Sequence, residues 1–283
     1  MNNKKIMWIF AAVALLVTVS ASFAIPMMDG QYTQGTFEQN DVLASVSGID
    51  EARGDTGGLV DDFKKDFLEN ERYKYLWTGL KNTLMITVIS LVIGLVLGIL
   101  VAIIRSVHDL RGEFYVLNAI CKVYTTVIRG TPVLVQLLII YYVIFATASI
   151  GQIWIAALAF GINSGAYVAE IVRAGINSVP KGQLEASSSL GMPFTASMIF
   201  VILPQAVRNI LPALCNEGIS LLKETSISGY IGLMDITKGG DLIRAQTYDA
   251  LLPLIVVAAI YLVIVLFITS LVHKLERRLN NAY

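Results

Sequence analysis

The sequence predicts an all-α polytopic membrane protein. Of its 283 residues, 55% are hydrophobic and only 15% are charged, and the mean hydropathy is +0.68. These values are too apolar for a soluble domain and are typical of a chain with several spanning helices. Basic and acidic residues each number 21, so no excess of basic side chains indicates a nucleic-acid partner.

Residues 1–25 form the first apolar segment. Lys4 and Lys5 precede the run, and Ser22 and Ala24 make a small-residue cleavage pattern near its end. The segment is therefore a signal anchor or a cleaved signal peptide, and both alternatives export the residues that come directly after it.

Residues 26–75 hold eleven acidic and five basic side chains. A net-acidic segment of this kind is tolerated outside the cell, so we predict that it is extracytoplasmic. Within it, Val60–Tyr75 is either an amphipathic helix at the membrane interface, with Phe63, Phe67 and Leu68 on one side, or a solvated linker.

Residues 76–283 are predicted to form the transmembrane domain, with five spans. The first covers about 76–104, and the second starts near Leu117 and is kinked or broken at Gly130-Thr131-Pro132. The third covers 153–176, the fourth 206–222, and the last 253–272. Residues 224–248 are broken by glycines and partly polar. Basic residues follow the first span and the last span. The C-terminal end of each of these spans, and with the last one the C-terminus of the chain, is therefore expected in the cytoplasm.

Two glycines and the two cysteines of the sequence are expected to have roles in helix packing and not in chemistry. Gly94 and Gly98 form a GxxxG-like pair that permits close approach of another helix, although such pairs are common in spans. Cys121 and Cys215 are far from any CxxC pattern, so they are expected to be buried free thiols, and no metal site is indicated.

The stretch between the third and fourth spans, Glu185 to Pro204, has an unusual composition. It combines three consecutive serines with Gly191 and Pro193, which predicts two short helices joined by a bend. Ala186–Val207 lacks charge and is long enough to span a membrane, so a transmembrane helix is the competing interpretation. The helix breakers favour a docking loop at about 177–205.

This loop resembles the EAA loop of ABC-importer permeases, the inner-membrane components of binding-protein-dependent transport. The matching positions have the family's spacing, with Ser187 and Val201 as conservative departures, and are Glu185, Ala186, Ser187, Gly191, Val201, Leu203 and Pro204. The resemblance implies that this loop couples the chain to a partner ATPase and that the spans form a five-span importer-permease core.

Polar side chains at membrane depth are costly, so they are candidates for function. A helix broken at Gly130-Thr131-Pro132 exposes backbone groups that can bind a polar solute. Arg129 is suited to a carboxylate and Glu170 to an ammonium group, with neighbouring polar groups orienting the solute. The alternatives are that Arg129 and Glu170 pair with each other or anchor the helices at the interface. The expected pathway residues are Arg129, Thr131, Gln136, Asn163, Tyr167, Glu170, Thr225 and Ser226.

Three segments that contain pathway residues resemble the polar-amino-acid branch of ABC-importer permeases. They are Arg129–Pro132, Ala166–Glu170 and Lys223–Ile227. The resemblance implies import of a polar or charged amino acid across a bacterial plasma membrane. It also implies two copies of an ATPase subunit that holds ATP and Mg²⁺, an extracytoplasmic amino-acid-binding protein, membrane lipid, and a second permease copy or a sister permease.

No phosphate-binding loop or hydrolase motif occurs in the sequence, so the chain is not expected to be an enzyme or to hold a cofactor. An importer permease for a different small solute is the nearest alternative. A membrane sensor or scaffold would be favoured if the acidic segment proved to be a folded receptor module.

Overall fold

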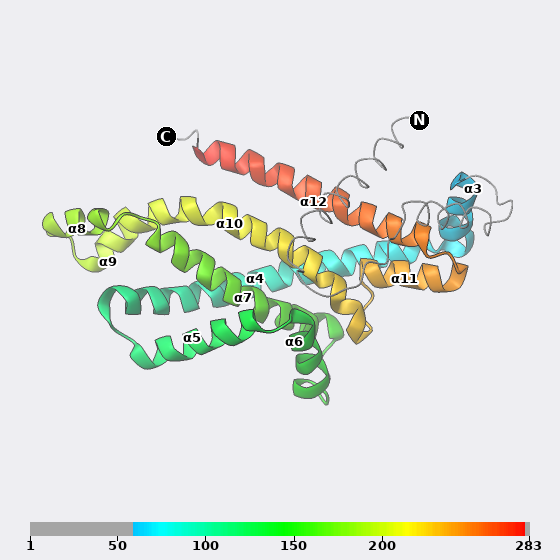
Figure 1. Cartoon of the computed structure of the whole chain (residues 1–283), viewed down its shortest axis with the longest axis horizontal. Coiled ribbons are helices and arrows are strands. Elements are labelled where there is room, and N and C mark those ends of the chain that lie inside the picture. The colour runs from blue at the N-terminus through cyan, green and yellow to red at the C-terminus, as the bar shows by residue number, and fades with distance from the viewer. Residues whose placement is uncertain (1–58, 281–283) are drawn as a thin grey trace, which may run out of the picture. The chain divides into compact units, whose positions relative to one another are not determined.

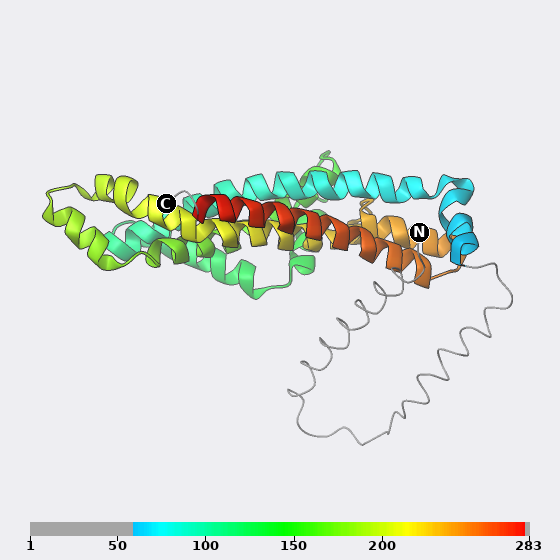
Figure 2. The ribbon, with the colours of Figure 1, turned by 90° about the horizontal axis from the view of Figure 1, so that it is seen from above.

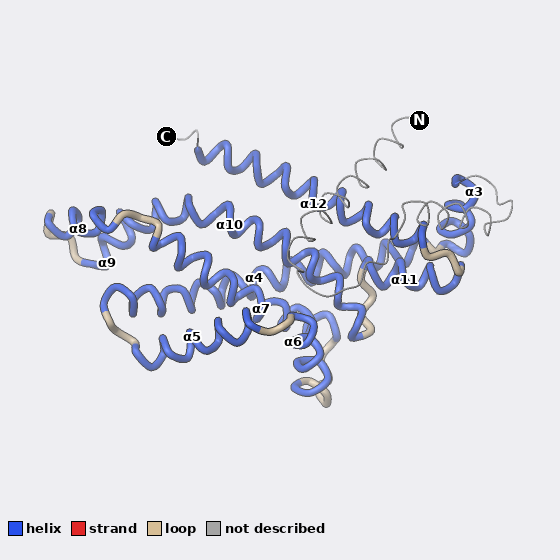
Figure 3. The backbone as a smooth tube through the Cα atoms, viewed as in Figure 1, coloured by secondary structure: helices blue, strands red, loops and turns tan. Residues whose placement is uncertain are grey.

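The computed structural model describes residues 59–280, and the predicted signal segment and most of the acidic segment lie outside this range. Within it the structure consists of helices joined by short loops, with no strand (Figures 1 and 3). The helices are α3 (Leu59–Phe63), η2 (Lys64–Leu68), η3 (Glu69–Glu71), α4 (Tyr73–Arg111), α5 (Tyr115–Gly130), α6 (Val133–Ile139), η4 (Ile140–Ile144), α7 (Gln152–Asn177), α8 (Lys181–Ser189), α9 (Phe194–Ser197), η5 (Met198–Ile202), α10 (Leu203–Glu224), η6 (Thr225–Ile231), α11 (Ile236–Thr247) and α12 (Leu251–Asn280).

Four helical stretches in this part of the chain are long and apolar enough to cross a membrane. They are α4, α7, the continuous stretch Phe194–Ile231, and α12 up to Lys274. The pair α5 and α6–η4 adds a fifth if its two arms, bent by 109°, count as one span. The expected all-α membrane fold and the break at Gly130–Pro132 are therefore confirmed.

The fourth span differs from the prediction. Instead of starting near Ala206, the helical path begins at Phe194 and runs through η5 into α10 without a loop. Pro204 does not interrupt it, because it occupies the start of α10, where the missing N–H is tolerated.

Helices α4 and α7 form the most extensive contact in the fold, and α10 packs against both (Figures 1 and 2). The predicted glycine pair creates this contact. A Cβ atom on Gly94 would lie 3.0 Å from the Ser164 side chain, and one on Gly98 would lie 2.5 Å from Val168 Cγ1. The pair therefore serves packing within the chain.

The short helices before α4 correct the prediction for Val60–Tyr75. They are neither one amphipathic helix nor a solvated linker, because Asn70 and Glu71 adopt positive φ and break the path. Phe67 is buried in a cluster with residues of α11 and α12, including Ile243 and Val257. The segment thus belongs to the packed domain. Of the two cysteines, Cys121 is buried as expected, whereas Cys215 is partly exposed.

Asp235 is a buried carboxylate at the junction of η6 and α11. It is fully buried, and its Oδ1 atom accepts a hydrogen bond from Lys238 N at 2.8 Å, which caps α11. Its Oδ2 atom has no hydrogen-bond partner among the described residues. Burial raises the pKa of Asp235 to about 6, because the charged form loses its hydration.

We expect Gly98→Val to lower the free energy of unfolding by about 2 kcal/mol, because the new side chain overlaps Val168 and the backbone of Gly165. Denaturation in detergent micelles measures the change. Gly182→Val is the matched control, since no atom of the part of the chain that the structure describes lies within 4 Å of its Cβ position. Equal losses in both variants would contradict the close-packing argument.

The raised pKa of Asp235 predicts a pH dependence of stability. Between its ordinary pKa of 3.8 and about 6 the folded state binds a proton that the unfolded state releases, so stability falls as pH rises through this range. Asp235→Asn keeps the capping oxygen and removes the charge. At pH 7.5 we expect the variant to be more stable by up to roughly 3 kcal/mol, with the difference vanishing near pH 4. Unfolding midpoints across this range test this, and a parallel pH profile for both proteins would refute it.

Candidate functional site: the helical elbow and the polar spans

The predicted docking loop is a sharp elbow between α8 and α9. Gly191 adopts φ +78°, a left-handed conformation that favours glycine. The N–H of Met192 donates to the Ser187 carbonyl at 3.1 Å, and the N–H of Gly191 donates to the Ser188 carbonyl at 2.9 Å. This pair of bonds is a Schellman motif, which satisfies the last carbonyls of α8. Pro193 then starts α9, so no single helix runs across this stretch.

The elbow presents most of its predicted residues to the surroundings. Glu185, Ala186 and Gly191 are exposed, and Leu190, which was not among the residues predicted from sequence, is 83% exposed. Further along, Leu203 and Pro204 are exposed and Val201 is half-buried. Ser187 is buried, and its hydroxyl donates to the Leu184 carbonyl. A single exposed apolar side chain is common on protein surfaces, so the exposure of Leu190 shows that this side chain is accessible and not that a partner covers it.

The elbow lies at the end of the bundle where α4 ends and toward which the C-terminal part of α12 runs (Figures 1 and 2). The guanidinium of Arg111, at the end of α4, lies 5.1 Å from the ring centre of Phe194 in α9, a cation–π contact that ties the two segments. Lys181 and Arg208 also lie on the helices at this end, in α8 and α10.

At the break between α5 and α6, Gln136 holds the two arms together. Its Nε2 group lies within hydrogen-bond distance of Ile128 O at 2.8 Å, Thr131 O at 3.1 Å and Thr131 Oγ1 at 2.7 Å. Its Oε1 atom accepts from Asn163 Nδ2 of α7 at 2.9 Å. Thr131, Gln136 and Asn163 thus form one network, and the bonds are used to fix the broken backbone.

Arg129 and Tyr167 meet beside this break. The Arg129 guanidinium lies 5.3 Å from the Tyr167 ring centre, and Arg129 is exposed. The pair offers a positive charge and an aromatic face next to a broken helix.

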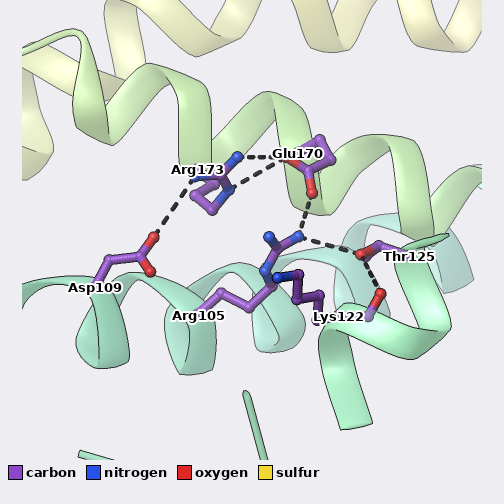
Figure 4. Close-up of polar contacts among 6 residues, drawn as sticks. All are labelled: Arg105, Asp109, Lys122, Thr125, Glu170 and Arg173. Carbon is purple, nitrogen blue, oxygen red and sulfur yellow. Dashed lines mark hydrogen bonds and ion pairs between the residues drawn. The ribbon is translucent and has the colours of Figure 1, made fainter. Parts of the chain in front are cut away.

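Glu170 belongs to a different cluster, shown in Figure 4. One carboxylate oxygen pairs with Arg105 Nη1, and the other accepts from Arg173 Nη2 at 2.9 Å. Arg105 also donates to Thr125 Oγ1 at 3.2 Å, and Arg173 Nη1 lies 3.5 Å from Asp109 Oδ2. The two positive and two negative charges balance, and the ion pairs between them connect α4 to α7. The alternative that Glu170 pairs with Arg129 is therefore wrong.

The remaining pathway candidates do not join either group. Thr225 is fully buried and donates to the Leu222 carbonyl at 2.7 Å. Ser226 lines a separate cavity of about 420 Å³ with Lys238, Asp241 and Arg244. Glu217 accepts a hydrogen bond from Ser164 at 2.8 Å, so it braces α10 against α7.

Arg105 and Asp109 are the members of the cluster around Glu170 that sequence reasoning missed. In the sequence, Arg105 indicates only the cytoplasmic turn after the first span. The spacing of four residues on α4, opposite Glu170 and Arg173 spaced by three on α7, is the one signal that could have indicated a shared face.

Glu170→Gln should lower the free energy of unfolding by about 2 kcal/mol, because it leaves the Arg105 and Arg173 guanidinium groups without their shared carboxylate in a partly buried site. Chemical denaturation in micelles measures the loss. Glu113→Gln is the matched control, since its ion pair with Arg111 is nearly half exposed and should contribute little. A Glu170 variant as stable as the control variant would argue against the structural role of the cluster.

Comparison with known proteins agrees with this arrangement. Residues 94–281 match the family described as binding-protein-dependent transport system inner membrane component. The arginine transport system permease protein ArtQ of Bacillus subtilis (strain 168) is 42% identical over 209 residues, which cover 73% of this chain and 93% of ArtQ. The L-cystine transport system permease protein TcyB of the same organism is 38% identical over 219 residues, covering 76% of this chain and 91% of TcyB.

Solved structures give the same result. The crystal structure of an amino acid ABC transporter with histidines matches with a TM-score of 0.68 and 41% identity, covering 75% of this chain and 98% of that one. The MetNI methionine ABC transporter in an inward-facing conformation matches at 22% identity with a TM-score of 0.62, which shows the shared fold. In this family the ATPase lies in a separate subunit and a binding protein delivers the solute. The chain is therefore a multi-pass membrane protein of the binding-protein-dependent transport inner-membrane component family, the permease subunits of ABC importers.

Proposed function

We propose that this chain is the permease through which a polar or charged amino acid enters a bacterial cell. The observation that carries the proposal is the exposed, rigid elbow between α8 and α9, combined with relatives named for arginine, glutamine and cystine transport. A solute-uptake assay on the reconstituted complex, with competition among these amino acids, tests the substrate class. Uptake that none of them competes for would indicate another small solute.

In the proposed mechanism, a groove on each of two ATPase subunits grips one elbow. ATP and Mg²⁺ are held by those subunits, and closure of the ATPase pair pushes α8. The residues in contact are Glu185, Ala186, Gly191 and Leu190, because these are exposed on the elbow. The buried Ser187 supports the turn from within, and Val201, Leu203 and Pro204 connect the elbow to α10.

The solute path is assigned to the face around the α5–α6 break. Arg129 and Tyr167 are the groups suited to contact the solute, because Arg129 is exposed and Tyr167 lies against it. Thr131, Gln136 and Asn163 fix the shape of the break, and Glu170 holds α7 to α4. Thr225 and Ser226 lie apart from this face, so their role in the path depends on a second permease copy or a sister permease that completes the pore.

The proposal extends to the orientation of the chain in the membrane. The elbow and the C-terminus are assigned to the cytoplasm, and α11 to the side that receives the amino-acid-binding protein. Support comes from the basic residues at the elbow end of the bundle, since positive side chains are retained inside.

Glu185→Lys and Gly191→Leu should each uncouple ATP hydrolysis from uptake, lowering amino-acid uptake at least tenfold while ATPase activity persists. Glu185→Lys reverses a charge on the contact surface. Gly191→Leu adds a side chain whose Cβ meets no atom of residues 59–280 within 4 Å, so the added bulk is available to obstruct a docked partner. Both activities are measured in proteoliposomes.

Gly112→Leu provides the matched control for the glycine variant. Gly112 has φ +71° and equally open surroundings, but lies in the α4–α5 turn. It carries the same backbone strain, of about 1 to 2 kcal/mol. Equal loss of uptake in both glycine variants would show that strain, rather than docking, causes the defect.

A further inference from the structure

A cavity of about 310 Å³ lies on the inner side of the elbow. It is bounded by the C-terminal ends of α4 and α7, by α8 and by η5. None of the residues assigned to the solute path lines it. The cavity is therefore a separate site, located where the elbow meets the spans.

The walls of the cavity combine an apolar floor with polar groups of opposite charge. Leu184, Met198 and Ile202 are among its apolar residues. Its charged and polar residues are Asp109, Asn177 and Lys181.

These polar groups have capacity for a ligand. Asp109 uses its Oδ2 atom for Arg173, at 3.5 Å. Lys181 is exposed and forms no ion pair within residues 59–280. An apolar occupant alone would leave the Lys181 ammonium unpaired, whereas a molecule with one charge of each sign can pair with Lys181 and also with Asp109, which has Arg173 as its first partner.

We propose that this cavity binds a small zwitterion with an apolar body, namely an α-amino acid with an aliphatic side chain. Its carboxylate pairs with Lys181, its ammonium with Asp109, and its side chain contacts the floor. The volume and the mostly apolar lining with a few polar groups are those of small-molecule sites.

A ligand bound in this cavity would restrict the movement of α8. This consequence rests on the proposed function of α8 in coupling the chain to the ATPase. The ligand bridges α8 to the ends of α4 and α7, so it opposes displacement of the elbow. The site would thus let an amino acid on the elbow side of the membrane slow the importer without entering the solute path.

The test measures binding of L-leucine to the purified full-length chain in detergent by titration calorimetry. Two analogues dissect the recognition: 4-methylpentanoate lacks the ammonium, and 3-methylbutylamine lacks the carboxylate. We expect saturable binding of L-leucine and at least tenfold weaker binding of each analogue. Absence of L-leucine binding, or equal affinity for either analogue, overturns the proposal.

Variants locate the binding. Met198→Trp fills the cavity and Lys181→Gln removes the ammonium, and each should weaken L-leucine binding at least tenfold. Lys181 is exposed, so its variant remains informative if Met198→Trp fails to fold. Lys64→Gln, an exposed lysine in η2, is the matched control and should bind as the unmodified chain does.

Unchanged binding in Lys181→Gln would place L-leucine elsewhere, for example beside Arg129, and refute this site. The measurement involves neither ATPase nor uptake. Failure of the transport proposal would therefore appear in the uptake assay and not here.

Discussion

The close approach of α4 to α7 is the constraint on which the other features depend. Within lipid there is no hydrophobic drive between helices, so van der Waals packing and polar contacts must hold them together. Gly94 and Gly98 allow this packing because their missing side chains leave room for Ser164 and Val168. Once the two helices are this close, the charges near their ends meet, and the path of α7 fixes where α8 begins.

The charge cluster around Glu170 depends on that contact. An unpaired ion would be costly in this partly buried cluster, but two arginines and two carboxylates on neighbouring helices compensate one another. Recruiting Glu170 to bind a solute would break two of these pairs. Arg129 contacts an aromatic ring and breaks no ion pair by binding a solute, so of the two charged residues predicted for the solute path it is the one suited to this role.

Local features of this fold could be predicted from sequence, and long-range pairings could not. Gly191 followed by Pro193 specifies a left-handed cap and a new helix start wherever the segment lies, and Gly130–Pro132 specifies a break in the same way. The partners of Glu170 depend on which spans are neighbours, and hydropathy does not contain that information. The direct passage of α9 into α10 was missed because Pro204 was interpreted as a boundary, although a first-turn proline is compatible with a continuing helix.

Because α9, η5 and α10 form one continuous helical path, a displacement of the elbow would be transmitted directly to α10. A flexible loop before α10 would absorb the displacement, but a helical path transmits it along the axis toward Glu217, which is bonded to Ser164 of α7. Pro212 lies inside α10 between these points, where its missing N–H weakens the helix and provides a place for bending. The first part of α10 also packs on α7, since Ile210 lies directly against Gly175, and Asn209 Nδ2 donates to Ser178 Oγ at 2.8 Å. A displacement of α8 would therefore pass to α7 through these contacts as well as along α10.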